Sequence, residues 1–226
     1  MATDAKVVVG NQYCDDKERE LTVRKTSLFF PSDGFEAYDN QTGNLIFRVD
    51  NYVGRGSSVS DELVLMDPAG ASIITLHRKL PSLHSRWEAF LGERVEGQKL
   101  LFSVRRSSIF GGNRGGLSIE YRVEGSFAAR SCRVLYEGVE DGEVVAEIKR
   151  KVDACANVVF GRDVFCLCLR PQVDSAFAMG LVLVLDRLTG DNDLSDDDMD
   201  SAAVGDAEML EGGVDGSGKG LLILSQ

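Results

Sequence analysis

The sequence predicts a mainly β protein in which an antiparallel sheet closes around one buried helix. Short strand-like segments separated by turns fill residues 20–169, and a long apolar segment follows at Asp174–Leu188. No polar side chain interrupts this segment between Ala176 and Leu185, so a helix here would be apolar on every face and would have to be surrounded. The apolar run is about half of the ~20 residues that a membrane span needs, which favours enclosure by protein.

The ends of the segment 174–188 favour a helix as much as its length does. Asp174 and Ser175 can supply N-cap oxygens, and Gly190 can end the helix in a left-handed turn. A buried strand remains the alternative, because Val182 and Val184 are β-branched.

Three segments of similar design predict β-hairpins, at residues 36–50, 63–79 and 134–151. Asp and Gly residues in the middle of each segment suit the positive φ of a tight turn. Further strands are predicted at residues 20–25, 87–90, 100–106, 118–123 and 164–169. Val164–Leu169 is apolar on both faces, which predicts a central strand. Turns every 8 to 12 residues, roughly, indicate an antiparallel sandwich or barrel.

Charge and composition divide the chain into three parts. Residues 1–18 have little pattern and are predicted to form a flexible arm, residues 19–190 the folded domain, and residues 191–226 a disordered tail. The net charge of −11 is concentrated in that tail, where ten acidic residues and no basic one lie between Asp191 and Asp215. The apolar residues Leu221–Leu224 could be either a last strand or a disordered end.

The sequence predicts an intracellular protein in a reducing compartment. The five cysteines are odd in number and scattered, and the first ten residues lack a basic start followed by a long apolar run. Cys166 and Cys168 alternate within one strand and are predicted to be buried thiols on the same side. We expect a cytoplasmic location, with the plasma membrane surface or the nucleus as alternatives.

No pattern of catalytic, metal-binding or cofactor-binding residues stands out. His77 and His84 are the two histidines, and neither accompanies a nucleophile-elbow pattern. The glycine-rich segment 111–116 lacks the Gly-Lys-Ser/Thr ending of a phosphate loop. The acidic segment 191–202 has Asp196 and Ala202 where a calcium loop needs Gly and Glu. We therefore expect a protein that is not an enzyme and that has no cofactor or metal.

Six segments resemble the successive signatures of the plant LURP-one-related proteins: Leu21–Leu28, Phe47–Tyr52, Leu65–Asp67, Leu76–Lys79, Phe102–Ser108 and Met179–Asp186. The resemblance covers residues 20–188 in the right order. Because that family is similar in fold to the Tubby C-terminal domain and the phospholipid scramblases, it implies a Tubby-like closed barrel of about twelve antiparallel strands around a central hydrophobic helix. The family's molecular function is largely unassigned, and the resemblance implies a link to plant defence.

Basic pairs and triplets near the predicted strand ends are the candidate ligand-binding residues. Several of them on one rim would form a site for an anionic lipid headgroup, such as that of a phosphoinositide. Charged outward residues that keep strands soluble are the alternative explanation. The candidates are Arg24, Lys25, Arg78, Lys79, Arg105, Arg106, Lys149, Arg150 and Lys151.

The expected function is binding by a monomer, first of all to anionic membrane lipids. A protein-interaction or nuclear regulatory module that uses the acidic tail is the alternative, and no nucleic-acid signature is evident. Ser195 precedes Asp196, Asp197 and Asp198, which suits phosphorylation by an acidophilic kinase. The tail could also fold back on the basic rim and compete with an anionic ligand.

Overall fold

The structure, a computed structural model, describes residues 7–26, 34–51, 62–79, 86–107, 121–137, 142–153, 158–193 and 221–225. One helix, α1 (Ser175–Asp193), and one 3₁₀ turn, η2 (Asn11–Tyr13), accompany the strands of these residues. The strands are β1 (Arg19–Lys25), β2 (Phe35–Asp39), β3 (Leu45–Asn51), β4 (Glu62–Met66), β5 (Ser72–Arg78), β6 (Trp87–Leu91), β7 (Phe102–Ser107), β8 (Tyr121–Ser126), β9 (Ser131–Tyr136), β10 (Glu143–Arg150), β11 (Val152–Asp153), β12 (Val158–Val159), β13 (Val164–Leu169) and β14 (Leu221–Ser225).

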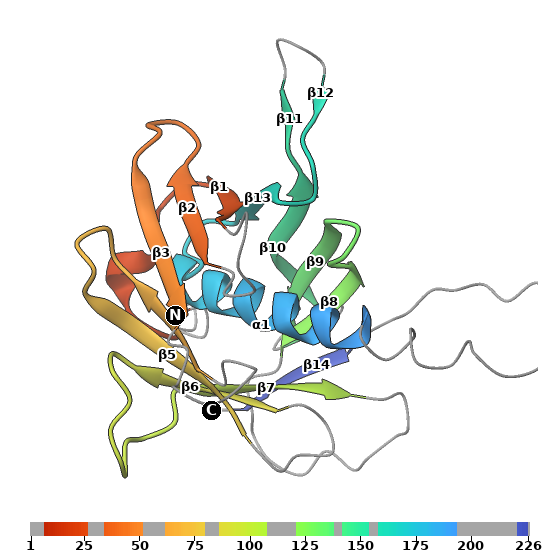
Figure 1. The fold of residues 1–226 in the computed structure, drawn as a ribbon. Helices are drawn as coiled ribbons and strands as arrows, with labels where there is room; N and C mark the ends of the chain where they lie inside the picture. Colours follow the sequence, from red (N-terminus) through yellow and green to blue (C-terminus); the bar gives the residue numbers. More distant parts are fainter. Residues whose placement is uncertain are drawn as a thin grey trace, which may run out of the picture.

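One antiparallel sheet of twelve strands curves round α1, which crosses the middle of the molecule (Figure 1). The strand order is β14, β7, β6, β5, β4, β3, β2, β1, β13, β10, β9 and β8, and β11 pairs with β12 in a separate ribbon. The predicted mainly β fold around a central helix is therefore confirmed. The end strands β14 and β8 lie side by side without a hydrogen-bonded ladder between their described residues. The sheet is thus not closed by hydrogen bonds, in contrast to the predicted closed barrel.

The three predicted hairpins are confirmed as β2–β3, β4–β5 and β9–β10. In the first turn, Asp39 Oδ1 accepts hydrogen bonds from the backbone N–H groups of Gln41 and Thr42, and Gly43 has a φ of +71°. Glycine adopts a positive φ without steric cost, and an aspartate side chain that accepts the N–H groups of the turn stabilises it. The predicted strand at 164–169 is β13, which lies between β1 and β10.

The core is the space between the inner face of the sheet and α1. All residues of α1 from Ser175 to Leu185 are buried, as an apolar run without a polar face requires. The ring of Phe177 lies against the rings of Phe102 on β7 and Tyr121 on β8, with centroid distances of 5.2 and 4.9 Å. Gly180 allows the helix to approach β5, because a Cβ atom at this position would lie 2.8 Å from Ile74 Cδ1.

Asp174 fixes the start of α1 and joins it to the N-terminal residues of the chain. Its side chain is fully buried, and its Oδ1 accepts the N–H of Phe177 at 3.0 Å, which is N-cap geometry. Its Oδ2 accepts three further N–H groups, from Val8 at 3.2 Å, Val9 at 2.7 Å and Gly10 at 3.0 Å. The carboxylate charge also lies at the positive end of the helix dipole.

The boundaries of the predicted parts differ from the structure at both ends of the folded domain. The prediction of a flexible arm is wrong for residues 7–18, because Asp174 binds their backbone, Ser175 Oγ donates to the Tyr13 carbonyl, and Cys14 forms a β-bridge to Asp174. The helix extends beyond the predicted residues 174–188 to Asp193.

At the C-terminal end, Leu221–Ser225 form β14, which pairs with β7. Of the two alternatives for this segment, a last strand and a disordered end, the structure has the strand. The prediction of a disordered tail over residues 191–226 is therefore wrong for this strand as well as for the last turn of α1. Residues 194–220 lie outside the described residues.

We predict that Asp174→Asn lowers the free energy of unfolding by about 2–4 kcal/mol, because the amide has one acceptor oxygen and turns an NH₂ group toward buried backbone donors. Urea denaturation measures this change, and hydrogen exchange at Val9 and Gly10 is expected to become faster. The control is Asp163→Asn at an exposed position, which is expected to change the stability little. Equal denaturation midpoints for Asp174→Asn and the unsubstituted protein would show that the carboxylate is not needed.

Candidate functional site

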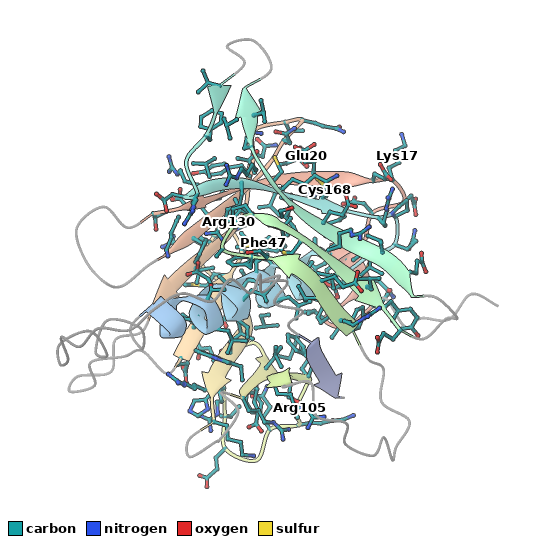
Figure 2. The ribbon with its side chains drawn as sticks, turned by 90° about the vertical axis from the view of Figure 1, so that its right-hand side faces the viewer. Lys17, Glu20, Phe47, Arg105, Arg130 and Cys168 are labelled. Carbon is teal, nitrogen blue, oxygen red and sulfur yellow. The ribbon has the colours of Figure 1, made fainter. Side chains whose placement is uncertain are left out.

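The nine predicted basic residues lie in two separate regions of the sheet. Five of them lie on β1 and at the end of β10, the two strands that flank β13: Arg24, Lys25, Lys149, Arg150 and Lys151. The other four, Arg78, Lys79, Arg105 and Arg106, lie on or next to β5 and β7. Figure 2 shows Arg105 on the opposite side of α1 from Glu20 on β1 and Cys168 on β13. A single rim that contains all nine residues is therefore ruled out.

Lys25 points into the barrel and not toward a surface rim. It follows Leu21 and Val23 on the buried face of β1, and its Nζ lies 3.2 Å from Asp186 Oδ2 on α1. The Nζ atom also lies over the Phe35 ring, 5.8 Å from its centroid. Lys25 therefore neutralises an acidic residue of the helix and does not belong to a headgroup site.

Arg130 is a second cation at Asp186 and was not predicted. It is 6% exposed, and its guanidinium lies between the rings of Phe127 and Phe165, at 4.2 and 4.3 Å from their centroids. Its Nε donates to the Arg162 carbonyl at 2.9 Å, and its Nη2 lies 3.7 Å from Asp186 Oδ1. Burial lowers the pKa of Arg130, and Asp186 opposes this effect. A guanidinium stacked between two rings and paired with a carboxylate is a structural cation.

Arg24 and Lys149 are each paired with a carboxylate on the outer surface. Arg24 Nη2 lies 2.5 Å from Glu36 Oε2 on the neighbouring strand β2, and this arginine lowers the pKa of the Glu36 carboxyl. Lys149 forms an ion pair with Glu147 two residues earlier on β10, which raises the pKa of the lysine. Neither side chain is a free cation, so both contribute little net positive potential to this surface.

Lys151 lies across the outer face of the sheet, above Cys166. Its Nζ donates to Thr22 Oγ1 at 2.8 Å and to Asn40 Oδ1 at 2.5 Å. Both acceptors are uncharged, so the positive charge of Lys151 is held in place but not neutralised. The side chain connects β10 to β1 and to the β2–β3 turn across β13.

Arg150 and Arg162 complete a group of cations at the end of β10. Both are exposed, and neither forms an ion pair with another described residue. Arg150 Nε donates to the Ala129 carbonyl at 3.2 Å, which leaves the charge without a partner of opposite sign. We call Arg150, Lys151 and Arg162 the hairpin base, because the ribbon β11–β12 begins and ends between them. Arg162 was not predicted, since it stands alone in the sequence beside Asp163.

A shallow concavity of about 300 Å³ lies next to this region on the outer face of β1, β13 and β10. Three glutamates and three basic residues contribute to its lining, so its charge is balanced and does not favour an anion. These are Glu18, Glu20, Glu147, Arg19, Lys149 and Arg170. Figure 2 shows Glu20, Cys168 and Lys17 on this side of the molecule.

The described cysteines are free thiols with raised pKa values. Burial raises the pKa of Cys132 and of Cys166 to about 12, and burial together with Asp174 raises the pKa of Cys14 to about 11. Cys166 and Cys168 are on the same side of β13, as predicted; Cys166 is buried, whereas Cys168 is only partly buried and borders the concavity. A thiol with such a pKa is protonated at neutral pH and is a poor nucleophile.

The basic residues of β5 and β7 differ in their surroundings. Lys79 Nζ lies 3.0 Å from Glu88 Oε1, and Arg78 is half-buried. Arg105 is exposed, and the backbone of Arg106 pairs with Leu222 of β14. Ser195 lies outside the described residues. Among the helices that the structure describes, none is long and apolar enough to cross a membrane.

We predict that Arg130→Met lowers the free energy of unfolding by about 3 kcal/mol, because it leaves Asp186 with one of its two cations while methionine still fills the space between the rings. Thermal or urea denaturation measures the change. Arg133→Met, at an exposed position on the adjacent strand β9, is the matched control and is expected to change stability by less than about 0.5 kcal/mol. Equal stability of the two variants would mean that the buried ion pair adds nothing to the fold.

We predict that the pair Arg24–Glu36 stabilises the protein by less than about 1 kcal/mol and only above acidic pH. The folded-state pKa of Glu36 is lower than its usual value of 4.5, so its contribution is present above that pH and is lost as the pH falls through the folded-state pKa. Urea denaturation of Arg24→Gln and of the unsubstituted protein at pH 7 and pH 3 is the measurement. The difference in stability should shrink at pH 3, and a difference that grew would contradict this assignment.

Comparisons with known proteins agree with this fold. The model of the family LURP-one-related matches residues 19–186. In Arabidopsis thaliana, Protein LURP-one-related 5 is 52% identical over 193 residues, covering 82% of this chain and 90% of the relative. Protein LURP-one-related 12 is also 52% identical, covering 83% of this chain and 86% of the relative.

A solved structure of another protein from Arabidopsis thaliana is also similar to this chain. It is 28% identical in sequence, has a TM-score of 0.60, and is matched over 81% of this chain and 99% of that protein. The family model covers every strand from β1 to β13, and the two relatives at 52% identity each cover more than four fifths of the chain. The chain therefore belongs to the LURP-one-related family.

Proposed function

We propose that this protein is a non-enzymatic peripheral membrane-binding protein, and that the hairpin base binds the headgroups of anionic phospholipids. One observation carries the proposal: three cations at one end of the molecule have no carboxylate within ion-pair distance among the described residues. The cations are Arg150, Lys151 and Arg162, and the first and third are exposed.

The position of the hairpin base supports contact with an extended surface. The ribbon β11–β12 extends beyond the rest of the sheet at this end of the molecule (Figure 1). A flat charged surface can therefore meet this end before it meets the paired charges on the sides of the sheet. Each basic residue near an anionic leaflet contributes about 1 kcal/mol to binding, so three such residues can hold a protein reversibly.

Two features support the part of the proposal that the protein has no catalytic activity. The described thiols are held protonated by their raised pKa values. The concavity beside β13 is shallow and balanced in charge, whereas active sites usually bring together groups whose pKa values are shifted toward neutral pH. The link to plant defence and the role of the acidic tail stay predictions.

We predict that the double variant Arg150→Glu and Arg162→Glu binds anionic vesicles at least tenfold more weakly than the unsubstituted protein, because each change replaces attraction by repulsion. Co-sedimentation with phosphatidylcholine vesicles, with and without a phosphoinositide, measures the binding. Binding of the unsubstituted protein should need the anionic lipid and should weaken as salt is raised above about 0.1 M.

The matched control is Arg105→Glu, which reverses an exposed charge on β7 on the other side of α1. This variant is expected to bind like the unsubstituted protein. A loss of binding free energy for Arg105→Glu about half that of the double variant, which reverses two charges instead of one, would show that only net charge matters. Absence of binding by the unsubstituted protein would contradict the proposed function and would favour a protein partner.

A further inference from the structure

The ribbon β11–β12 is the one part of the described chain that continues β10 and β13 outside the large sheet. Val152 pairs with Val159, Asp153 pairs with Val158, and the Phe160 N–H donates to the Lys151 carbonyl at 2.9 Å. In Figure 1 the two strands project away from the body of the molecule, and no other described strand flanks them. Sequence analysis did not predict this ribbon, because its strands are only two residues long.

The side chains of this ribbon are unusually apolar for an exposed element. Val152, Val158, Val159 and Phe160 are 50, 56, 52 and 41% exposed, and we call them the apolar hairpin. They account for four of the six large hydrophobic residues that are exposed in the described part of the chain. A group of adjacent exposed hydrophobic side chains on a soluble surface indicates an interaction site.

Exposed apolar residues lie on both faces of the ribbon, which bears on the kind of partner. Val152 and Val159 are directly opposite one another and share one face. Val158 lies on the other face, opposite Asp153, because successive strand residues alternate. A protein groove or an added strand would cover one face or one edge. A lipid interface can contact the apolar side chains on both faces of an inserted ribbon at the same time, so it suits this distribution.

The charged residues around the ribbon also favour a lipid bilayer as the partner. The residues from Lys149 to Asp163 include four basic ones (Lys149, Arg150, Lys151 and Arg162) and two acidic ones, Asp153 and Asp163. The cations of the hairpin base therefore flank the apolar hairpin on its side toward the body of the protein. Apolar residues beyond a ring of cations suit a bilayer, in which hydrocarbon lies beneath anionic headgroups.

We propose that the apolar hairpin inserts into the interface of an anionic phospholipid bilayer while the hairpin base contacts the headgroups. This inference rests on the proposed function and adds the means by which the protein is anchored. The insertion is shallow, because the two strands have unpaired backbone edges that cannot be left without hydrogen bonds in the hydrocarbon core. Water and headgroups near the acyl boundary can still satisfy those edges.

Tryptophan fluorescence tests the insertion directly. In Phe160→Trp, the new indole is placed in the apolar hairpin, whereas the single native tryptophan, Trp87, is 2% exposed and shielded in the core. The variant is mixed with phosphatidylcholine vesicles that contain a phosphoinositide and acyl chains brominated either near the glycerol or near the methyl end. Leu91→Trp is the matched control, because Leu91 is an exposed hydrophobic residue on β6, which lies far from the ribbon (Figure 1).

We expect the emission of Phe160→Trp to shift to shorter wavelength and to be quenched more by bromines near the glycerol end. Leu91→Trp and the unsubstituted protein should show neither change. A triple variant with Val158, Val159 and Phe160 each replaced by serine should bind about tenfold more weakly, or about 1.4 kcal/mol, with the same circular dichroism spectrum. Its remaining binding should still depend on salt.

The outcomes separate the insertion from the proposed function. Sedimentation of Phe160→Trp with vesicles but without quenching would overturn the insertion and leave the headgroup contact intact. Equal binding by the triple serine variant would also overturn the insertion. Failure of every variant and of the unsubstituted protein to sediment would instead overturn the proposed function itself.

Discussion

The fold depends on the enclosure of a helix that has no polar face over its buried length. A helix of this kind is stable in water only if protein surrounds it, and the curved sheet supplies that surround. The two acidic residues that flank this buried length, Asp174 and Asp186, then need partners of their own. Asp174 obtains four backbone donors at the start, and Asp186 obtains Lys25 and Arg130 two turns before the end. Both acidic residues link the helix to distant parts of the chain, so they fix its position within the curved sheet.

The main elements could be predicted because their signals are local. Alternation and turn residues indicate the three hairpins, and an apolar run with Asp174 before it indicates a capped helix. Short elements gave no such signal: the ribbon β11–β12 has two residues per strand, too few for a period to be recognised. The role of Leu221–Ser225 depended on whether β7 offers an unpaired edge, which is a property of the assembled sheet.

The candidate site could be predicted only in part, because residue type gives charge but not the partners of that charge. Arg24, Lys25 and Lys149 look equivalent to Arg150 in the sequence, yet each of them has a carboxylate neighbour from another element or from its own strand. Arg130 gave no signal, since neither its burial nor its two aromatic neighbours follows from the adjacent residues. Asp186, an acidic residue at the end of an apolar run, was the one available hint that a buried cation should exist.

The place of α1 in the chain has a consequence for how the protein is made. During synthesis the strands β1 to β13 leave the ribosome before the helix that fills their interior, so the inner face of the sheet has no packing partner until residues 175–193 follow. Val8 to Gly10, near the start of the chain, also lack the carboxylate that binds their N–H groups until Asp174 has been made. The core therefore cannot be completed until the helix has been made, and a chain that stops before Asp174 leaves the apolar residues of the strands without their packing partner.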